Sequence, residues 1–198
     1  WGILVLFVGL SWRSVAILAC VALVSAGLAW TLLLKPYQRM RFMAFVNPAV
    51  DARGAGYNVI QAQIAIGSGG LLGKGVGEGS QARLRFLPEA ATDFTFAVVG
   101  EELGFVGIAF VLGLFGLLFH RFYRVAADAE DDFAALAILG IGALFLVHLT
   151  VNAGMNLGIM PVTGIPLPFL SAATSFLVAV SLALGVVESV AVRRRTFA

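Results

Sequence analysis

A run of 21 residues without a charged side chain, residues 14–34, is the feature that most constrains the fold of this chain. A helix needs about 20 apolar residues to cross the hydrocarbon core of a bilayer. Lipid offers the backbone no hydrogen-bond partners, so a span of this kind is a helix that satisfies its own amides. The composition agrees, with 60% hydrophobic and 12% charged residues and a mean hydropathy of +0.97. The sequence therefore predicts an integral membrane protein, and it excludes a disordered chain, a nucleic-acid-binding tail and a disulfide-stabilised scaffold.

Three further segments are long and apolar enough to span a membrane: residues 94–119, 133–160 and 172–192. Residues 1–10 are apolar but too short to span, and we interpret them as the end of a truncated helix. The expected fold class is therefore all-α. We predict one membrane domain over residues 1–198, a polytopic helix bundle with four full spans and a truncated one.

The distribution of basic residues predicts the orientation, because short cytoplasmic loops are rich in Lys and Arg. The loop at residues 161–171 contains no basic residue, which places it outside the cytoplasm. The long connection at residues 35–93 lies on the same side. The basic residues expected on the cytoplasmic side are Arg13, Arg121, Arg124, Arg193, Arg194 and Arg195.

The long loop at residues 35–93 carries seven basic and four acidic residues, a net charge of +3. This balance suits an anionic ligand such as a lipid pyrophosphate, and it equally suits solvated charges near lipid headgroups. Residues 57–66 are apolar and periodic, and seven glycines follow between positions 67 and 79. The glycines do not form a phosphate-binding loop, because Ser68 and Gly75 stand where that motif needs Gly and Ser or Thr. We expect a tightly turned, re-entrant backbone there instead.

Asp93 stands directly before the span at residues 94–119, at its outer end. Two interpretations are open: Thr92 or Asp93 caps the helix, or the carboxylate of Asp93 acts as a general base at the membrane surface. Glu101 and Glu102 follow about two turns further along. Acidic residues inside a span are costly and face a cavity or a partner.

Polar residues recur at helical spacing within residues 133–160, at His148, Asn152 and Asn156. Interhelical hydrogen bonding is the favoured interpretation of this stripe. A metal site or proton path is the alternative, but it needs a further ligand. Three prolines and two glycines make residues 158–168 a kinked, non-helical segment.

Several segments closely resemble the RodA-like members of the SEDS family (shape, elongation, division and sporulation). The resemblance covers almost the whole chain and is carried by residues 39–48, 54–58, 61–75, 86–104 and 161–171. It implies a bacterial inner-membrane protein of about ten helices, of which this chain is the C-terminal half. One departure is Ala172 and Ala173, which stand where the family usually has an aromatic residue and glycine.

The resemblance implies a peptidoglycan glycosyltransferase that polymerises lipid II during cell elongation, with undecaprenyl pyrophosphate as leaving group. Asp93 is the expected catalytic base, and Glu89, Lys74, Arg39 and Ser171 are weaker candidates for substrate contacts. Expected partners are a class B penicillin-binding transpeptidase, other elongation-complex proteins and membrane lipids, with no nucleic acid. No cofactor and no protein metal site is expected, although a divalent cation (Mg²⁺ or Mn²⁺) with the substrate is left open. Two alternatives remain: a lipid II flippase, and a membrane scaffold for the transpeptidase.

Overall fold

The computed structural model describes residues 12–32, 34–47, 51, 54–83, 86–87, 89–129 and 131–196. These residues form helices and connecting segments without a strand, which confirms the predicted all-α class. The helices are α2 (Trp12–Leu32), α3 (Pro36–Val46), α4 (Ala55–Gly69), α5 (Ser80–Arg83), α6 (Thr95–Ala127), α7 (Asp132–Asn156) and α8 (Thr174–Thr196).

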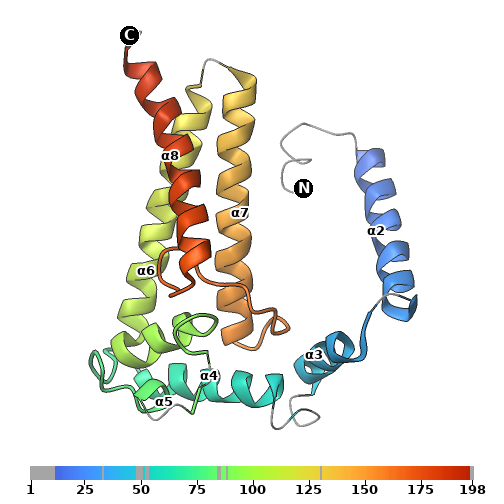
Figure 1. Cartoon of the computed structure of the whole chain (residues 1–198), viewed down its shortest axis with the longest axis vertical. Helices are drawn as coiled ribbons and strands as arrows, with labels where there is room; N and C mark the ends of the chain where they lie inside the picture. Colours follow the sequence, from blue (N-terminus) through green and yellow to red (C-terminus); the bar gives the residue numbers. More distant parts are fainter. Residues whose placement is uncertain are drawn as a thin grey trace.

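Four of these helices, α2, α6, α7 and α8, are long and apolar enough to cross a membrane. They overlap the segments that the sequence predicted as spans. The start of α2, the connection between α6 and α7 and the end of α8 lie toward one end of the molecule (Figure 1). The segment between α2 and α6 and the loop after α7 lie at the opposite end (Figure 1). The two loops that the sequence analysis placed on the same side thus lie at the same end of the molecule (Figure 1).

A bundle of α6, α7 and α8 forms the apolar core (Figure 1). The aromatic rings of Phe122 and Phe145 pack at a centroid distance of 5.8 Å between α6 and α7. Helix α2 stands apart from this bundle in Figure 1, and no residue in its apolar part is buried by the described chain. The remaining buried residues of this core are Val125, Ala126, Ile138, Val180, Val187 and Ala191.

Helix α4 lies across the end of the bundle where α6 begins and α7 ends, and it packs closely against the start of α6 (Figure 1). Small residues make this approach possible. Ala62 and Ala65 of α4 are buried against Ala97 of α6, and a Cβ added to Gly69 would collide with the carbonyl oxygen of Gly100. The part of the long connection that forms α4 is therefore folded and packs against the start of α6.

Helix α6 is broken at Gly104, whose φ of +67° lies in the left-handed region. The sequence predicted an uninterrupted span here, and the glycine-rich loop after α4 explains the difference. In a straight helix the amides of Phe105 and Val106 would donate to the carbonyls of Glu101 and Glu102. They donate instead to the carbonyls of Gly70 and Leu71, at 2.9 and 3.1 Å.

The loop also supplies the two complementary donors. The amides of Lys74 and Gly75 donate to the vacated carbonyls of Glu101 and Glu102, both at 3.0 Å. The two amides and the two carbonyls released by the break are thus paired with the loop, as a membrane environment favours. Gly73 and Gly75 adopt φ values of +79° and +108°, which confirms the tightly turned backbone expected from the glycine run.

Candidate active site

A cavity of about 580 Å³ opens beside Asp93, at the end of the bundle where α6 begins and α7 ends. Four segments form its walls: α3, the start of α4, the turn before α6 and the loop after α7. The residues that line it are Pro36, Tyr37, Met40, Arg41, Asp51, Gly54, Ala55, Asn58, Glu89, Asp93, Phe94, Val162 and Gly164.

Asp93 ends a tight turn before α6, with its amide donating to the carbonyl of Glu89 at 3.0 Å. The N-cap position of α6 belongs to Phe94, and it has no side-chain cap. The N-cap interpretation of Thr92 and Asp93 is therefore wrong. The helix starts one residue later than a cap at Asp93 requires, which leaves the carboxylate to face the cavity.

Partial burial raises the pKa of the Asp93 carboxyl above its ordinary value, and the negative charge of Glu89 acts in the same direction. The Thr92 hydroxyl and the Arg41 guanidinium lower this pKa, but they do not outweigh the burial. A carboxylate that holds its proton more strongly than usual is a better general base.

Two asparagines of α7 hold the main chain of Asp93. The side-chain amides of Asn152 and Asn156 both donate to the carbonyl oxygen of Asp93, at 2.8 and 3.3 Å. Asn152 also donates to the carbonyl of Ile165 at 2.8 Å, and His148 Nδ1 lies 3.1 Å from the carbonyl oxygen of Pro166. The predicted hydrogen-bonding role of this polar stripe is confirmed.

Ser171 joins the loop after α7 to the start of α6. Its hydroxyl accepts a hydrogen bond from the amide of Leu167 at 2.7 Å and lies 3.4 Å from the hydroxyl of Thr95. The next amide, of Ala172, donates to the carbonyl of Ala91 at 2.8 Å. Ser171 is buried and does not line the cavity.

Of the other predicted substrate contacts, Glu89 lines the cavity beside Asp93. Its backbone has a φ of +56°, unusual for a residue other than glycine, and its carboxylate accepts a hydrogen bond from Thr92 at 3.0 Å. Arg39 lies on α3 but is not among the lining residues.

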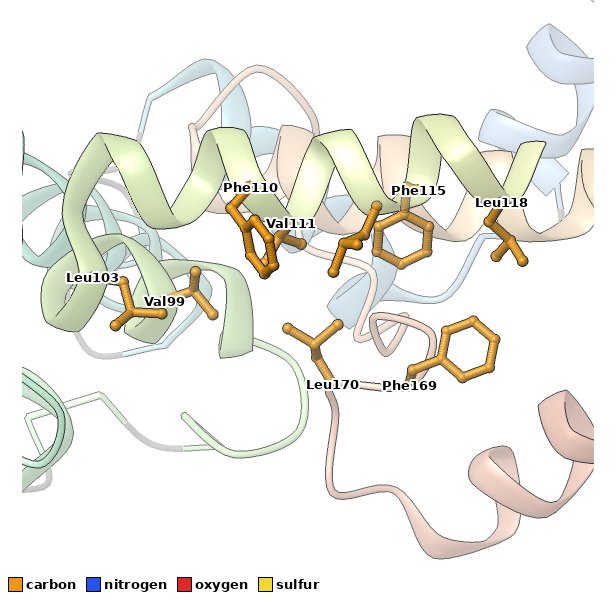
Figure 2. A pocket seen from close by; sticks show the side chains of 9 residues that line it. Val99, Leu103, Phe110, Val111, Phe115, Leu118, Phe169 and Leu170 are labelled. Carbon is orange, nitrogen blue, oxygen red and sulfur yellow. The ribbon is translucent and has the colours of Figure 1, made fainter. Parts of the chain in front are cut away.

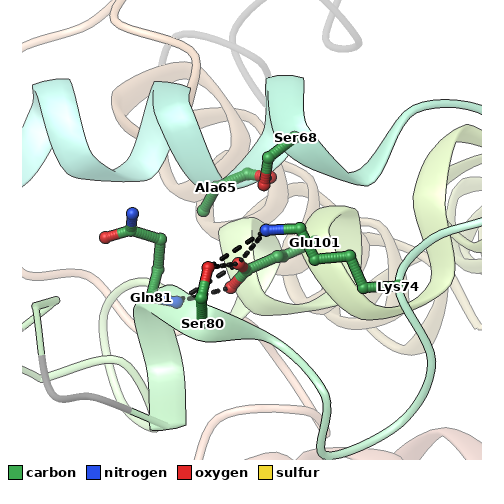
Figure 3. Close-up of polar contacts among 6 residues, drawn as sticks. All are labelled: Ala65, Ser68, Lys74, Ser80, Gln81 and Glu101. Atoms are coloured by element: carbon green, nitrogen blue, oxygen red, sulfur yellow. Dashed lines mark hydrogen bonds and ion pairs between the residues drawn. The ribbon is translucent and has the colours of Figure 1, made fainter.

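Lys74 lies at a separate polar cluster, where the glycine-rich loop meets the break in α6 (Figure 3). Its ammonium group is 2.7 Å from Oε1 of Glu101, whose side chain is fully buried. The same carboxylate accepts hydrogen bonds from the Ser80 hydroxyl at 3.0 Å and from the amide of Gln81. Glu101 thus faces a partner, one of the two roles expected of an acid within a span.

Sequence reasoning did not single out Tyr37, Arg41, Asp51 or Asn58, which also line the cavity. Arg41 is two positions from Arg39 and belongs to the same resembling segment, which was the only available signal. Only the folded position of α3 against α4 distinguishes the two arginines. Among the described residues, no group of three or more His, Cys, Asp and Glu side chains is placed to hold a metal ion.

A second, apolar cavity of about 510 Å³ lies along α6, with lining residues on both sides of the break at Gly104 (Figure 2). Phe169 and Leu170 from the loop after α7 face Val111 and Phe115 of α6 across it. The cavity has no charged residue in its lining, so it offers no chemistry comparable to that beside Asp93.

Comparison with known proteins finds relatives that belong to one family. The family model FTSW_RODA_SPOVE, described as "Cell cycle protein", matches residues 1–196. Peptidoglycan glycosyltransferase MrdB of Escherichia coli K12 is 44% identical over 195 residues, which cover 98% of this chain and 53% of that protein. Peptidoglycan glycosyltransferase RodA of Treponema pallidum is 44% identical over 169 residues, covering 85% of this chain and 39% of that protein. The chain thus spans about half the length of these relatives, or less.

A solved structure is similar as well. It is described as "Structural coordination of polymerization and crosslinking by a peptidoglycan synthase complex". The matching chain has a TM-score of 0.76 and 33% sequence identity, and the match covers 97% of this chain and 52% of that one.

Proposed function

Because this chain belongs to the FtsW/RodA/SpoVE family of cell cycle proteins, we propose that it is part of a peptidoglycan glycosyltransferase. The enzyme polymerises lipid II into glycan strands at the outer face of the bacterial inner membrane. The observation that carries the proposal is the carboxylate of Asp93, with its raised pKa, facing a charged cavity at the outer end of the bundle.

Asp93 acts as the general base. Its carboxylate takes the proton from the 4-hydroxyl of an N-acetylglucosamine unit while that oxygen attacks the anomeric carbon of the second substrate. The bond from the anomeric carbon to the pyrophosphate breaks, undecaprenyl pyrophosphate leaves, and the configuration inverts. Partial burial supports this role, because it makes the carboxylate more basic than one in water.

Arg41 is the cation best placed to balance charge at this site, since it lines the same cavity as Asp93. A guanidinium can bind phosphate oxygens through two parallel hydrogen bonds. Glu89 is a proposed substrate contact from the same wall. Arg39, Lys74 and Ser171 stay predictions, and each of them already has a partner in the protein.

The divalent cation also stays a prediction. The described residues offer no group of three or more ligating side chains. The proposed steps therefore use Asp93 and Arg41 alone.

We further propose a class B penicillin-binding transpeptidase as partner, together with other proteins of the elongation complex. The description of the similar solved structure, a complex that couples polymerization and crosslinking, supports this partner. The exposed apolar surface of α2 leaves room for helices outside the described chain.

The test is lipid II polymerisation by the full-length protein with its transpeptidase, comparing the wild type with Asp93→Ala. Asp132→Ala is a matched control, because it removes an exposed aspartate at the first turn of α7. We expect strand synthesis from the wild type and the control and none from Asp93→Ala, with the complex purifying equally well. Equal synthesis from Asp93→Ala would exclude Asp93 as the base. An inactive wild type, beside a known polymerase that works, would favour a flippase or a scaffold.

A further inference from the structure

Two fully buried amide side chains lie behind the candidate base. Asn152 and Asn156 have no exposed surface, and they sit on α7, one of the helices able to span a membrane. Buried amides are costly unless their donors and acceptors are paired. The donors and acceptors of both side chains are paired, largely with main-chain groups close to Asp93.

Asn152 joins the two walls of the cavity. Its two N–H donors serve two carbonyl oxygens, those of Asp93 and Ile165, each at 2.8 Å. Ile165 follows Gly164, which faces Asp93 so closely that an added Cβ would lie 3.2 Å from Oδ2 of the carboxylate. This one amide group therefore bridges the turn that carries the carboxylate and the part of the loop next to Gly164.

Asn156 fixes the first turn of α6. Its amide donates to the carbonyls of Asp93 and Asn152, at 3.3 and 2.8 Å, and its Oδ1 accepts from the amide of Ala97 at 3.2 Å. That amide belongs to the first turn of α6 and also donates to the carbonyl of Phe94 at 3.0 Å, so the Asn156 oxygen is its second acceptor. Phe94 supplies no side-chain cap, and α7 adds this acceptor to the first turn.

His148 shows that a hydrogen bond from this stripe need not involve Asp93. Its ring contacts the carbonyl of Pro166 in the same loop and stacks on Phe176 at a centroid distance of 4.6 Å. His148 thus links α7 to the loop after it and to α8, and its hydrogen bond goes to Pro166, not to the turn at Asp93. It is a control for effects that come from loosening the loop or the packing against α8 while the main chain of Asp93 keeps its donors.

We propose that Asn152 and Asn156 are positioning residues for the reaction: they fix the main chain of Asp93, and Asn152 sets the distance between its carboxylate and the loop at Gly164. The inference rests on the proposed role of Asp93 as the base. A base must be held within hydrogen-bond reach of the proton it takes, and small displacements cost much of the rate.

The test uses the full-length protein with its transpeptidase and compares Asn152→Leu with His148→Leu. Asn152→Leu keeps the approximate volume but removes both donors. We expect kcat to fall by about tenfold or more while KM for lipid II changes by less than about twofold. His148→Leu should keep kcat within about threefold of the wild type, because the carbonyl of Asp93 keeps both of its donors.

The pH profile gives a second readout, which loss of packing alone does not predict. If the cavity wall loosens, water reaches Asp93 and lowers the pKa of its carboxyl group. The fall of activity at low pH, the acid limb of the profile, should therefore move to lower pH in Asn152→Leu and stay in place in His148→Leu. The titratable groups that share the cavity with Asp93 are unchanged by these substitutions: Tyr37 and Arg41 of α3, Asp51 before α4, and Glu89 in the turn.

Equal losses from Asn152→Leu and His148→Leu, or an unchanged kcat and acid limb in Asn152→Leu, would overturn the inference. If Asn152→Leu does not fold, Asn152→Asp takes its place, since it keeps the shape and, as a neutral acid, one donor. A wild-type kcat in Asn152→Asp would overturn the inference, and a loss of about threefold or more would support it.

Labelling of Asp93 with a water-soluble carbodiimide separates this inference from the proposed function. The reagent modifies protonated carboxyl groups, so labelling against pH reports the titration of Asp93 by mass spectrometry without any turnover. We expect the midpoint to fall in Asn152→Leu and not in His148→Leu. An inactive wild type with this shift would reject the proposed function and keep the positioning role, whereas an unchanged midpoint would reject the positioning role.

Discussion

The ammonium group of Lys74 lies 2.7 Å from the carboxylate of Glu101, and this contact fastens the glycine-rich loop to α6 beside its break at Gly104. The side chain of Glu101 is fully buried, while that of Lys74 is 31% exposed. The short helical segment from Thr95 to the break begins two residues after Asp93. The ion pair therefore stabilises the part of α6 that leads directly into the candidate site.

Replacing Lys74 with Met should destabilise the protein by about 3 kcal/mol, because Glu101 keeps its buried charge and loses its cation. The hydroxyl of Ser80 and the amide of Gln81 remain as partners, but neither carries a charge. Chemical unfolding in mild detergent measures the change.

The double variant Lys74→Met with Glu101→Gln is the matched control for that experiment. It removes both charges, so it should be more stable than Lys74→Met alone. A double variant as unstable as the sum of the two single variants would show that the residues do not interact energetically.

Gly104→Ala should disrupt the docking of the glycine-rich loop. Residue 104 adopts a positive φ, and an added Cβ would collide with the amide of Gly73 and the carbonyl of Leu71. We expect a loss of at least about 2 kcal/mol in stability and a large loss of activity. Gly113→Ala is the control in the same helix, because nothing lies within 4 Å of an added Cβ there. Thermal unfolding of both variants should show no loss for Gly113→Ala.

Asp93→Asn should abolish activity without lowering stability at neutral pH. The raised pKa means that the folded protein binds this proton more tightly than the unfolded chain does. The ionised carboxylate therefore opposes folding above the ordinary pKa of aspartate, and a neutral amide removes that cost. The free energy of unfolding of both proteins should be measured across pH 3–8. The variant should be as stable as the wild type near pH 3 and at least as stable at higher pH.

Arg41→Gln should move the acid limb of the activity profile to higher pH. The guanidinium lowers the pKa of Asp93, so its removal lets the pKa rise further, and the base then becomes active only at higher pH. KM for lipid II should also rise, because a cation that faces the pyrophosphate is lost. Lys35→Gln is the control: it removes a positive charge from an exposed residue at the start of the same helix, outside the cavity. An equal effect from both variants would indicate a general charge effect in place of a local contact.

The long helices could be predicted from sequence because their signal is local. A run of apolar residues of the right length defines α2, α7 and α8 in almost any context. The break at Gly104 could not be predicted in this way. It depends on carbonyls and amides of residues 70–75, and nothing in the local pattern of α6 shows that another segment will take over its hydrogen bonds.

In the candidate site, too, single residues could be predicted from local sequence, whereas the contacts between them could not. Asp93 could be singled out because it stands at the start of a span within a resembling motif, and Asn152 because a polar residue inside a span needs a partner. Their contact could not be predicted, since it joins residues 59 positions apart. Arg41 faces Asp93 only because α3 folds back over the start of α4, a tertiary arrangement without a local signal.

The hydrogen bonds that the glycine-rich loop makes with α6 beside Gly104 limit how these two segments can move. Bending α6 further at this point would separate four main-chain pairs, and lipid could not replace any of them. The first turns of α6 and the glycine-rich loop should therefore move together or not at all. A partner that displaces the glycine-rich loop would therefore displace the first turns of α6 with it, and Asp93 lies two residues before those turns.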